Sequence, residues 1–140
     1  MPNPAFLTTG CHCGAVRVRL AEPPAYLNDC NCSLCTASGA IWGYLPMSAV
    51  DVQGATTAYR RADLDEVMVE LRFCPICGAT THWLPAKTPE SVGGRMGVNL
   101  RSVDFDRLAG IELRFPDGKA WTGDGAFAYR RPAIVIGADS

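Results

Sequence analysis

Three cysteines lie within six residues of the chain, at Cys30, Cys32 and Cys35. These three residues, the central triple, cannot all pair with one another as disulfides, but their sulfurs can all face one metal ion. A tetrahedral zinc ion held by three protein sulfurs keeps a fourth position for water or substrate, which is typical of a reactive site. The sequence therefore predicts a catalytic zinc site at the central triple.

The other four cysteines form two pairs, Cys11 with Cys13 and Cys74 with Cys77. The pairs are far apart in sequence and each lies beside an expected strand. Together, as the four-cysteine set, they predict a closed, structural zinc site with zinc–sulfur distances of about 2.3 Å. Such a site would tie the first strand of the domain to a middle strand.

Each group of cysteines has an alternative interpretation. The Cys74–Cys77 pair could be a redox dithiol, although no βαβ pattern surrounds it, and the Cys11–Cys13 pair could be ordinary buried cysteines. The central triple could be buried, or it could bind a second structural ion with His82 or Asp29 as fourth ligand.

Histidines and aromatic residues offer few further candidates. His12 lies between two expected ligands, but neighbouring side chains of an extended segment point in opposite directions, which favours a surface or supporting role. His82 is interpreted as a packed histidine. Large aromatic residues of a small β protein are usually core. Trp42 and Tyr44 are close in sequence to the central triple, so they are also candidates for the lining of a pocket. The aromatic residues considered are Trp42, Tyr44, Trp83 and Trp121.

Length and composition indicate one globular domain over residues 1–140, with 48% hydrophobic and 19% charged residues. The net charge of −1 argues against a nucleic-acid partner. Residues 1–7 do not resemble a signal peptide, and no apolar run is long enough to span a membrane. Clustered cysteines without an export signal suit a reducing compartment, so the expected location is cytoplasmic.

Alternating apolar and polar residues predict a mainly β fold with little helix. A short helical turn is expected at 104–108. The expected strands are at 15–20, 40–45, 50–53, 56–60, 66–73, 79–84, 95–100, 111–115 and 133–136.

Three motifs, at residues 10–14 (Gly-Cys-x-Cys-Gly), 30–35 (Cys-x-Cys-x-x-Cys) and 73–78 (Phe-Cys-x-x-Cys-Gly), resemble the signatures of the glutathione-dependent formaldehyde-activating enzyme family. The resemblance extends over residues 10–121. It implies small antiparallel β-sheets around a structural zinc, similar to the nucleotide-exchange chaperone of Rab-type GTPases. It also implies that the four-cysteine set holds the structural zinc and the central triple the catalytic zinc.

The activity that the resemblance implies is that of a carbon–sulfur lyase, which joins glutathione to formaldehyde and takes a small thiol and an aldehyde as partners. Many relatives place basic residues after the third cysteine of the triple, whereas Thr36 and Ala37 follow Cys35 here. The cations considered as substitutes are Arg60, Arg61, Arg95 and Arg101. A non-catalytic zinc-stabilised binding module and a thiol redox or zinc sensor remain the alternative functions.

Overall fold

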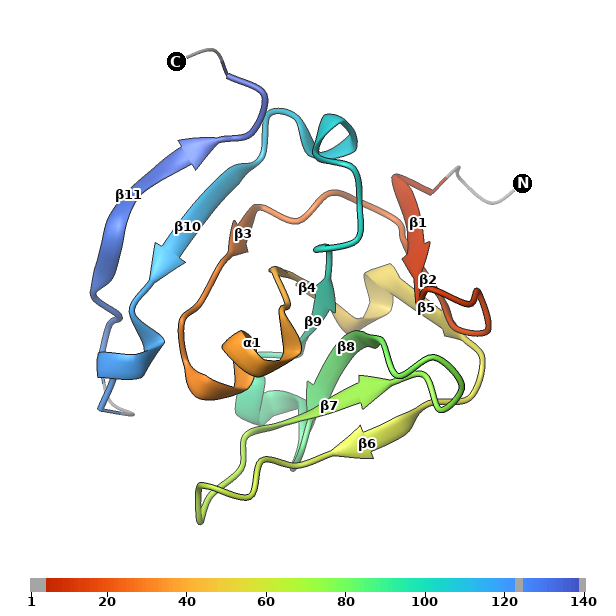
Figure 1. The fold of residues 1–140 in the computed structure, drawn as a ribbon, viewed down its shortest axis with the longest axis horizontal. Helices are drawn as coiled ribbons and strands as arrows, with labels where there is room; N and C mark the ends of the chain where they lie inside the picture. Colours follow the sequence, from red (N-terminus) through yellow and green to blue (C-terminus); the bar gives the residue numbers. More distant parts are fainter. Residues whose placement is uncertain (1–4, 123–124, 139–140) are drawn as a thin grey trace. The chain divides into compact units, whose positions relative to one another are not determined.

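A computed structural model describes residues 5–122 and 125–138, and it consists mainly of short β-strands (Figure 1). The mainly β class with little helix is thus confirmed. The described residues form two compact units, one made of 5–23 and 44–99 and the other of 24–43, 100–122 and 125–138. Residues 1–4, part of the segment considered as an export signal, lie outside the described residues. The expectation of a single domain stays a prediction.

The first unit contains two groups of antiparallel strands. One is a three-stranded sheet in the order β1-β2-β5, formed by β1 (Leu7–Gly10), β2 (Arg17–Leu20) and β5 (Val50–Gln53). The other has the order β9-β8-β7-β6, formed by β6 (Thr57–Tyr59), β7 (Val69–Phe73), β8 (Thr80–Pro85) and β9 (Arg95–Asn99). Two 3-10 turns, η1 (Met47–Ala49) and η2 (Pro89–Val92), complete the unit.

Strand β2 shows how the sequence pattern becomes structure. Val18 and Leu20 are fully buried, whereas Arg17 and Arg19 between them are exposed. Side chains of a strand alternate between its two faces, so one face of β2 enters the core of the first unit and the other faces water.

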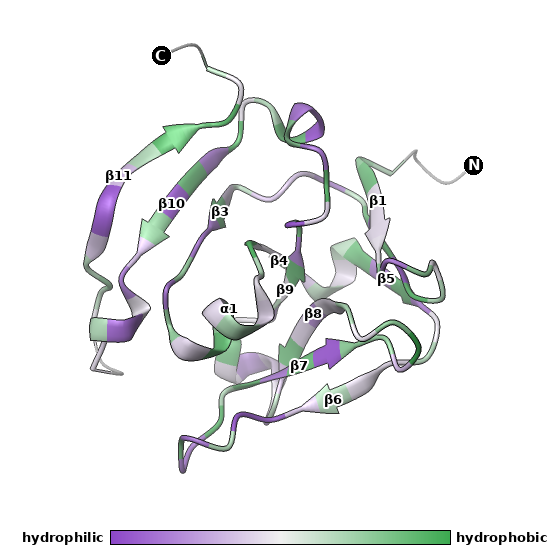
Figure 2. Cartoon of the chain, in the orientation of Figure 1, coloured by the Kyte–Doolittle hydropathy of each residue, from purple (hydrophilic) through white to green (hydrophobic). Residues whose placement is uncertain are grey.

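The second unit is organised around strands in the order β11-β10-β3-β4. Its elements are β3 (Tyr26–Asn28), α1 (Ser33–Ser38), the first two residues of β4 (Trp42–Pro46), η3 (Phe105–Leu108), β10 (Glu112–Pro116), η4 (Gly118–Ala120) and β11 (Tyr129–Val135). Figure 2 shows polar and apolar residues alternating along β10, in agreement with its half-buried pattern.

Strands β3 and β10 run parallel, whereas β3 with β4 and β10 with β11 are antiparallel. The carboxyl ends of β3 and β10 therefore meet at the same edge. The Asp29 amide extends the pairing by donating to the Arg114 carbonyl at 2.9 Å. Consequently the segment after β3, which contains the central triple, and the turn after β10 lie beside each other.

Most expected strands are present, but the expectation missed one helix and the first strand, and it described residues 26–29, where β3 forms, only as a short extended piece. Residues 33–38 form α1, although no helix was expected there, and β1 was not expected. Within residues 40–45, Gly43 interrupts an apolar segment, which is typical of a bulge or of a close approach by another segment. A Cβ atom there would lie 3.0–3.1 Å from the side chains of Leu100, Pro24 and Leu27, so close packing is the reason for the glycine.

Besides Cys74, two ionisable side chains are buried in the described part of the first unit, His82 and Glu70. His82 is 2% exposed, and its Nδ1 lies 2.8 Å from the Thr81 hydroxyl. Burial, assisted by the positive charge of Arg72, lowers the pKa of His82 to about 4. Burial raises the pKa of Glu70, but pairing with Arg72 and Arg60 outweighs burial and lowers it overall. His82 is therefore a neutral packed histidine at neutral pH.

Acidification is expected to destabilise the protein through His82. The folded pKa is about 4, whereas an unfolded histidine titrates at about 6.5, so the unfolded chain binds the proton first and stability is lost as the pH falls from about 6.5 to 4. The loss is on the order of 3 kcal/mol. Denaturant unfolding of the parent and of His82→Gln across this range checks it, because acid effects on the cysteines are common to both. Parallel pH dependence in the two proteins would contradict the assignment.

Candidate metal centres

The four-cysteine set comes together in the first unit. Cys11 and Cys13 lie in the turn before β2, and Cys74 and Cys77 lie in the turn between β7 and β8. All four sulfurs lie within 4.8 Å of one another. The Sγ of Cys13 is 3.6 Å from the Sγ atoms of Cys11 and Cys74. A zinc tetrahedron with arms of about 2.3 Å has sulfur–sulfur edges of about 3.8 Å, so the sulfur spacing fits zinc.

Backbone amides face the sulfurs of the four-cysteine set. The Val16 amide donates to Cys11 Sγ at 3.2 Å, and the Ile76 amide donates to Cys74 Sγ at 3.4 Å. The turn at Cys77 closes with Gly78 at a φ of 78°, a left-handed conformation that favours glycine. The amide of Ala79 makes the largest contribution to lowering the pKa of Cys77 to about 6. These donors favour thiolates, the form in which cysteine binds zinc.

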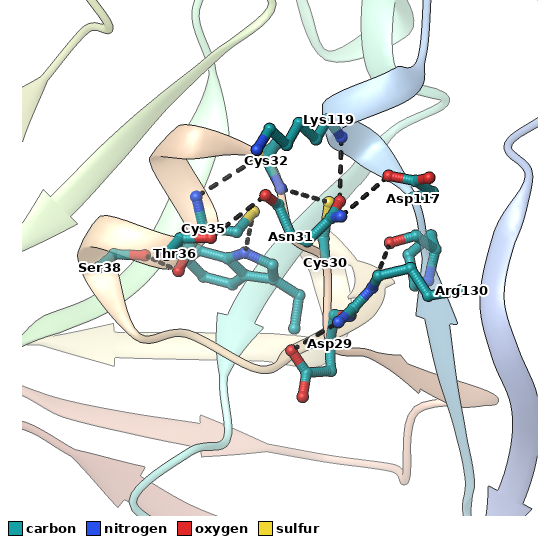
Figure 3. Close-up of polar contacts among 12 residues, drawn as sticks. Asp29, Cys30, Asn31, Cys32, Cys35, Thr36, Ser38, Asp117, Lys119 and Arg130 are labelled. Carbon is teal, nitrogen blue, oxygen red and sulfur yellow. Dashed lines mark hydrogen bonds and ion pairs between the residues drawn. The ribbon is translucent and has the colours of Figure 1, made fainter.

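The central triple comes together in the second unit, between β3 and the first turn of α1. The sulfurs of Cys30, Cys32 and Cys35 lie within 4.8 Å of one another, and all three residues are partly exposed. Figure 3 shows the three residues beside one another at the start of α1. No fourth cysteine, histidine or acidic side chain joins this group among the residues that the structure describes. The proposed alternative ligands, His82 and Asp29, are therefore not members of it.

Helix α1 is short, and its two ends are defined by local hydrogen bonds. The Cys32 sulfur accepts the Cys35 amide at 3.3 Å, which caps the first turn. Gly39 adopts a φ of 70° and donates its amide to the Cys35 carbonyl at 3.0 Å, which ends the helix. The helix thus folds Cys35 back toward Cys30 and Cys32.

Crowding determines the protonation of the central triple. Hydrogen bonding to Cys32 raises the pKa of Cys30, and hydrogen bonds to Cys30 and Cys32 raise that of Cys35. Three thiols so close cannot all ionise unless a positive charge is present, and a divalent cation would supply that charge. The amide of Cys32 donates to Cys30 Sγ at 3.5 Å, and the indole nitrogen of Trp42 donates to Cys35 Sγ at 3.4 Å. The donor set therefore fits a zinc ion with three protein ligands.

The turn after β10, residues 117–120, packs directly on the central triple. The Asn31 side chain holds this turn, because its Nδ2 donates to Asp117 Oδ1 at 2.9 Å and its Oδ1 accepts the Lys119 amide at 3.0 Å (Figure 3). A Cβ atom built on Gly118 would lie only 2.4 Å from Cys30 Sγ. Only a residue without a side chain therefore fits at position 118 in this arrangement.

Replacing Gly118 with alanine is expected to disturb the central triple while leaving the fold intact. The added methyl group would force either Cys30 or the turn to move, because contacts below 3.0 Å do not occur for real Cβ atoms. We expect at least a tenfold loss of zinc affinity at the triple, on the order of the loss seen when supporting contacts of a metal site are removed. Metal titration of Gly118→Ala checks this, with Ala120→Ser, an exposed position of the same turn, as the control. Unchanged zinc affinity in Gly118→Ala would show that the turn can move away from Cys30 without disturbing the central triple.

The remaining candidates from the sequence have separate positions. His12 is exposed, and Arg60 and Arg61 pair with Glu70 and Asp63 within the first unit. Of the aromatic residues, Trp42 is buried with its indole on Cys35, whereas Trp121 is 41% exposed.

The sequence interpretation did not identify the residues that surround the central triple. These are Asn31, Asp117, Gly118 and Lys119. Residues 116–119 have residue types that are typical of a turn, but nothing in the sequence indicated which other segment the turn would contact. That contact follows from the parallel pairing of β3 with β10.

Fold and sites together define a small β protein with two separate cysteine clusters of metal-binding type. The sequence profile of the glutathione-dependent formaldehyde-activating enzyme family matches residues 6–109, and the chain belongs to this family. A curated relative from Halomonas elongata, named for the same enzyme, is 34% identical over 96 residues, which cover 62% of this chain and 61% of the relative. The match thus spans less than two thirds of that relative's length.

One solved structure is similar to this chain in sequence and fold. The crystal structure of a Rhodobacter sphaeroides protein is 29% identical to this chain, with a TM-score of 0.57. The similarity covers 75% of this chain and 97% of the other. Within residues 5–122 and 125–138, no helix has the length and hydropathy required to span a bilayer.

Proposed function

We propose that this protein is a zinc-dependent carbon–sulfur lyase that, in the synthetic direction, adds a small thiol such as glutathione to a small aldehyde such as formaldehyde. The observation that carries the proposal is the convergence of the three partly exposed sulfurs of Cys30, Cys32 and Cys35. Three ligands are one fewer than a closed tetrahedral site requires, which leaves a position for substrate. Membership of the family supports the choice of thiol and aldehyde.

The two clusters divide structure and chemistry between them. The four-cysteine set supplies the four ligands of a closed site, so it is proposed to hold a structural zinc. The central triple is proposed to hold a catalytic zinc that is more easily lost. When bound, zinc would lower the pKa of a coordinated thiol and polarise an aldehyde oxygen.

The reaction forms one carbon–sulfur bond. The substrate thiol loses its proton, its sulfur bonds to the carbonyl carbon, and the electron pair of the carbonyl π bond takes up a proton to give a hydroxyl group. The protein's own contribution is to hold the reacting sulfur beside the triple. The Trp42 indole donates to the Cys35 sulfur, and the Cys32 amide donates to the Cys30 sulfur. Both hydrogen bonds favour the thiolate forms of these two cysteines.

Zinc content and glutathione binding together test the proposal. The freshly reduced parent is compared with a variant in which Cys30, Cys32 and Cys35 are all alanine, and glutathione is titrated against each. The proposal predicts two zinc ions per chain in the parent and one in the variant, with glutathione binding and adduct formation only in the parent. One zinc ion in both proteins and glutathione binding in neither would contradict it. A disulfide within the triple after mild peroxide, without adduct formation, would favour a redox sensor instead.

A further inference from the structure

The turn at residues 117–120 places a cation beside the central triple. Gly118 lies against Cys30, with room for no side chain, and the amide of Lys119 is bound by the Asn31 side chain at 3.0 Å. The backbone of Lys119 is therefore fixed by two contacts to the segment that carries the cysteines. In Figure 3 the Lys119 side chain extends from the turn in the direction of Cys32 and the start of α1.

The ammonium group of Lys119 is available to a ligand, unlike the neighbouring cations. Arg130 lies 3.7 Å from the Asp29 carboxylate and also donates to backbone carbonyls. Arg114 pairs with Glu112. Lys119 is exposed, and within residues 5–122 and 125–138 its ammonium has neither an ion pair nor a hydrogen bond. The triple thus has one uncommitted cation on the turn that covers it.

Charge explains why such a cation matters. Three thiolates with one divalent ion leave a formal charge of −1, and a thiol that carries carboxylates is repelled by that charge. We propose that Lys119 is a specificity-determining residue that binds a carboxylate of an anionic thiol, such as glutathione, at the rim of the central triple. The inference rests on the proposed function, and it assigns the charged part of the substrate to a residue outside the cysteine motifs.

The proposal separates anionic thiols from neutral thiols. Adduct formation with formaldehyde is measured for Lys119→Ala, Lys119→Arg and the parent, each loaded with zinc, with glutathione and with uncharged 2-mercaptoethanol as thiols. Glutathione binding without aldehyde is measured by calorimetry. Lys119→Ala is expected to raise the Kd and KM for glutathione roughly two- to fivefold, as for an exposed ion pair. Its kcat and its KM for 2-mercaptoethanol should not change, and Lys119→Arg should restore glutathione binding.

The other lysine of the chain provides the matched control. Lys87 is exposed and lies in the first unit, so Lys87→Ala is expected to behave like the parent with both thiols. The proposed role of Lys119 would be wrong if the parent and Lys119→Ala bound glutathione equally, or if Lys119→Ala lost as much activity with 2-mercaptoethanol as with glutathione. Either result would leave the proposed function standing. A parent that neither binds glutathione nor forms an adduct would overturn the proposed function as well.

Asn31 is assigned as the residue that positions Lys119. Because it binds the turn through both ends of its amide, Asn31→Ala should raise the Kd for glutathione about as much as Lys119→Ala does. Residues that act through one interaction are not additive, so the double variant should be no weaker than either single variant. Fully additive losses would overturn the positioning role of Asn31.

Discussion

Cys77→Ala is expected to yield an unfolded or insoluble protein. Cys77 belongs to the set of four sulfurs that joins the turn before β2 to the turn between β7 and β8. Zinc binding at structural sites is worth on the order of 10 kcal/mol, comparable to the whole stability of a small domain. Removing one of the four proposed ligands should therefore cost most of the stability of the first unit. Soluble yield, circular dichroism and zinc content of the purified variant measure this.

Ile76→Ala provides the control for Cys77→Ala. Ile76 lies in the same turn and is 76% exposed, so removing its side chain should cost little stability, and the variant should retain its zinc. A Cys77→Ala protein with the same cooperative unfolding transition as the parent would show that the four-cysteine set does not stabilise the fold.

Cys32→Ala is expected to retain the fold and to lose adduct formation by at least about a hundredfold, because a proposed ligand of the proposed catalytic zinc is removed. The sulfur of Cys32 also caps α1 by accepting the Cys35 amide. Loss of a cap typically costs about 1 kcal/mol, so a small decrease in melting temperature is expected. The measurements are thermal unfolding, zinc per chain, and the rate of adduct formation from glutathione and formaldehyde.

Ala37→Ser is the control for Cys32→Ala, because Ala37 is an exposed position of the same helix. It should match the parent in activity and nearly in stability. If Cys32→Ala and Cys77→Ala damaged folding equally, the proposed division into a catalytic and a structural site would be wrong. Wild-type activity in Cys32→Ala would remove the central triple from the reaction.

Local sequence signals predicted most of the strands. The alternation at residues 15–20 became the half-buried strand β2, because a strand with one buried face has a period of two. Strand β7 lies within 66–73 as expected, but its neighbouring residues Glu70 and Leu71 are both buried. Helix α1 was missed because six residues are too short to show a period of 3.6. Its end signal is Gly39, which follows the run of small residues and adopts the left-handed conformation of a helix C-cap.

The two groups of cysteines could be identified from the sequence alone, since ligand spacing within each motif is a local property of the chain. The metal-ligand assignments made from it stay predictions, and the structure shows that the sulfurs of each group can meet. The surroundings of the central triple, in contrast, depend on how distant segments pack. The parallel pairing of β3 with β10 brings Gly118 and Lys119 to Cys30 and Asn31 across more than 80 residues of sequence. No local pattern encodes such a contact, because strand order depends on the packing of the whole unit.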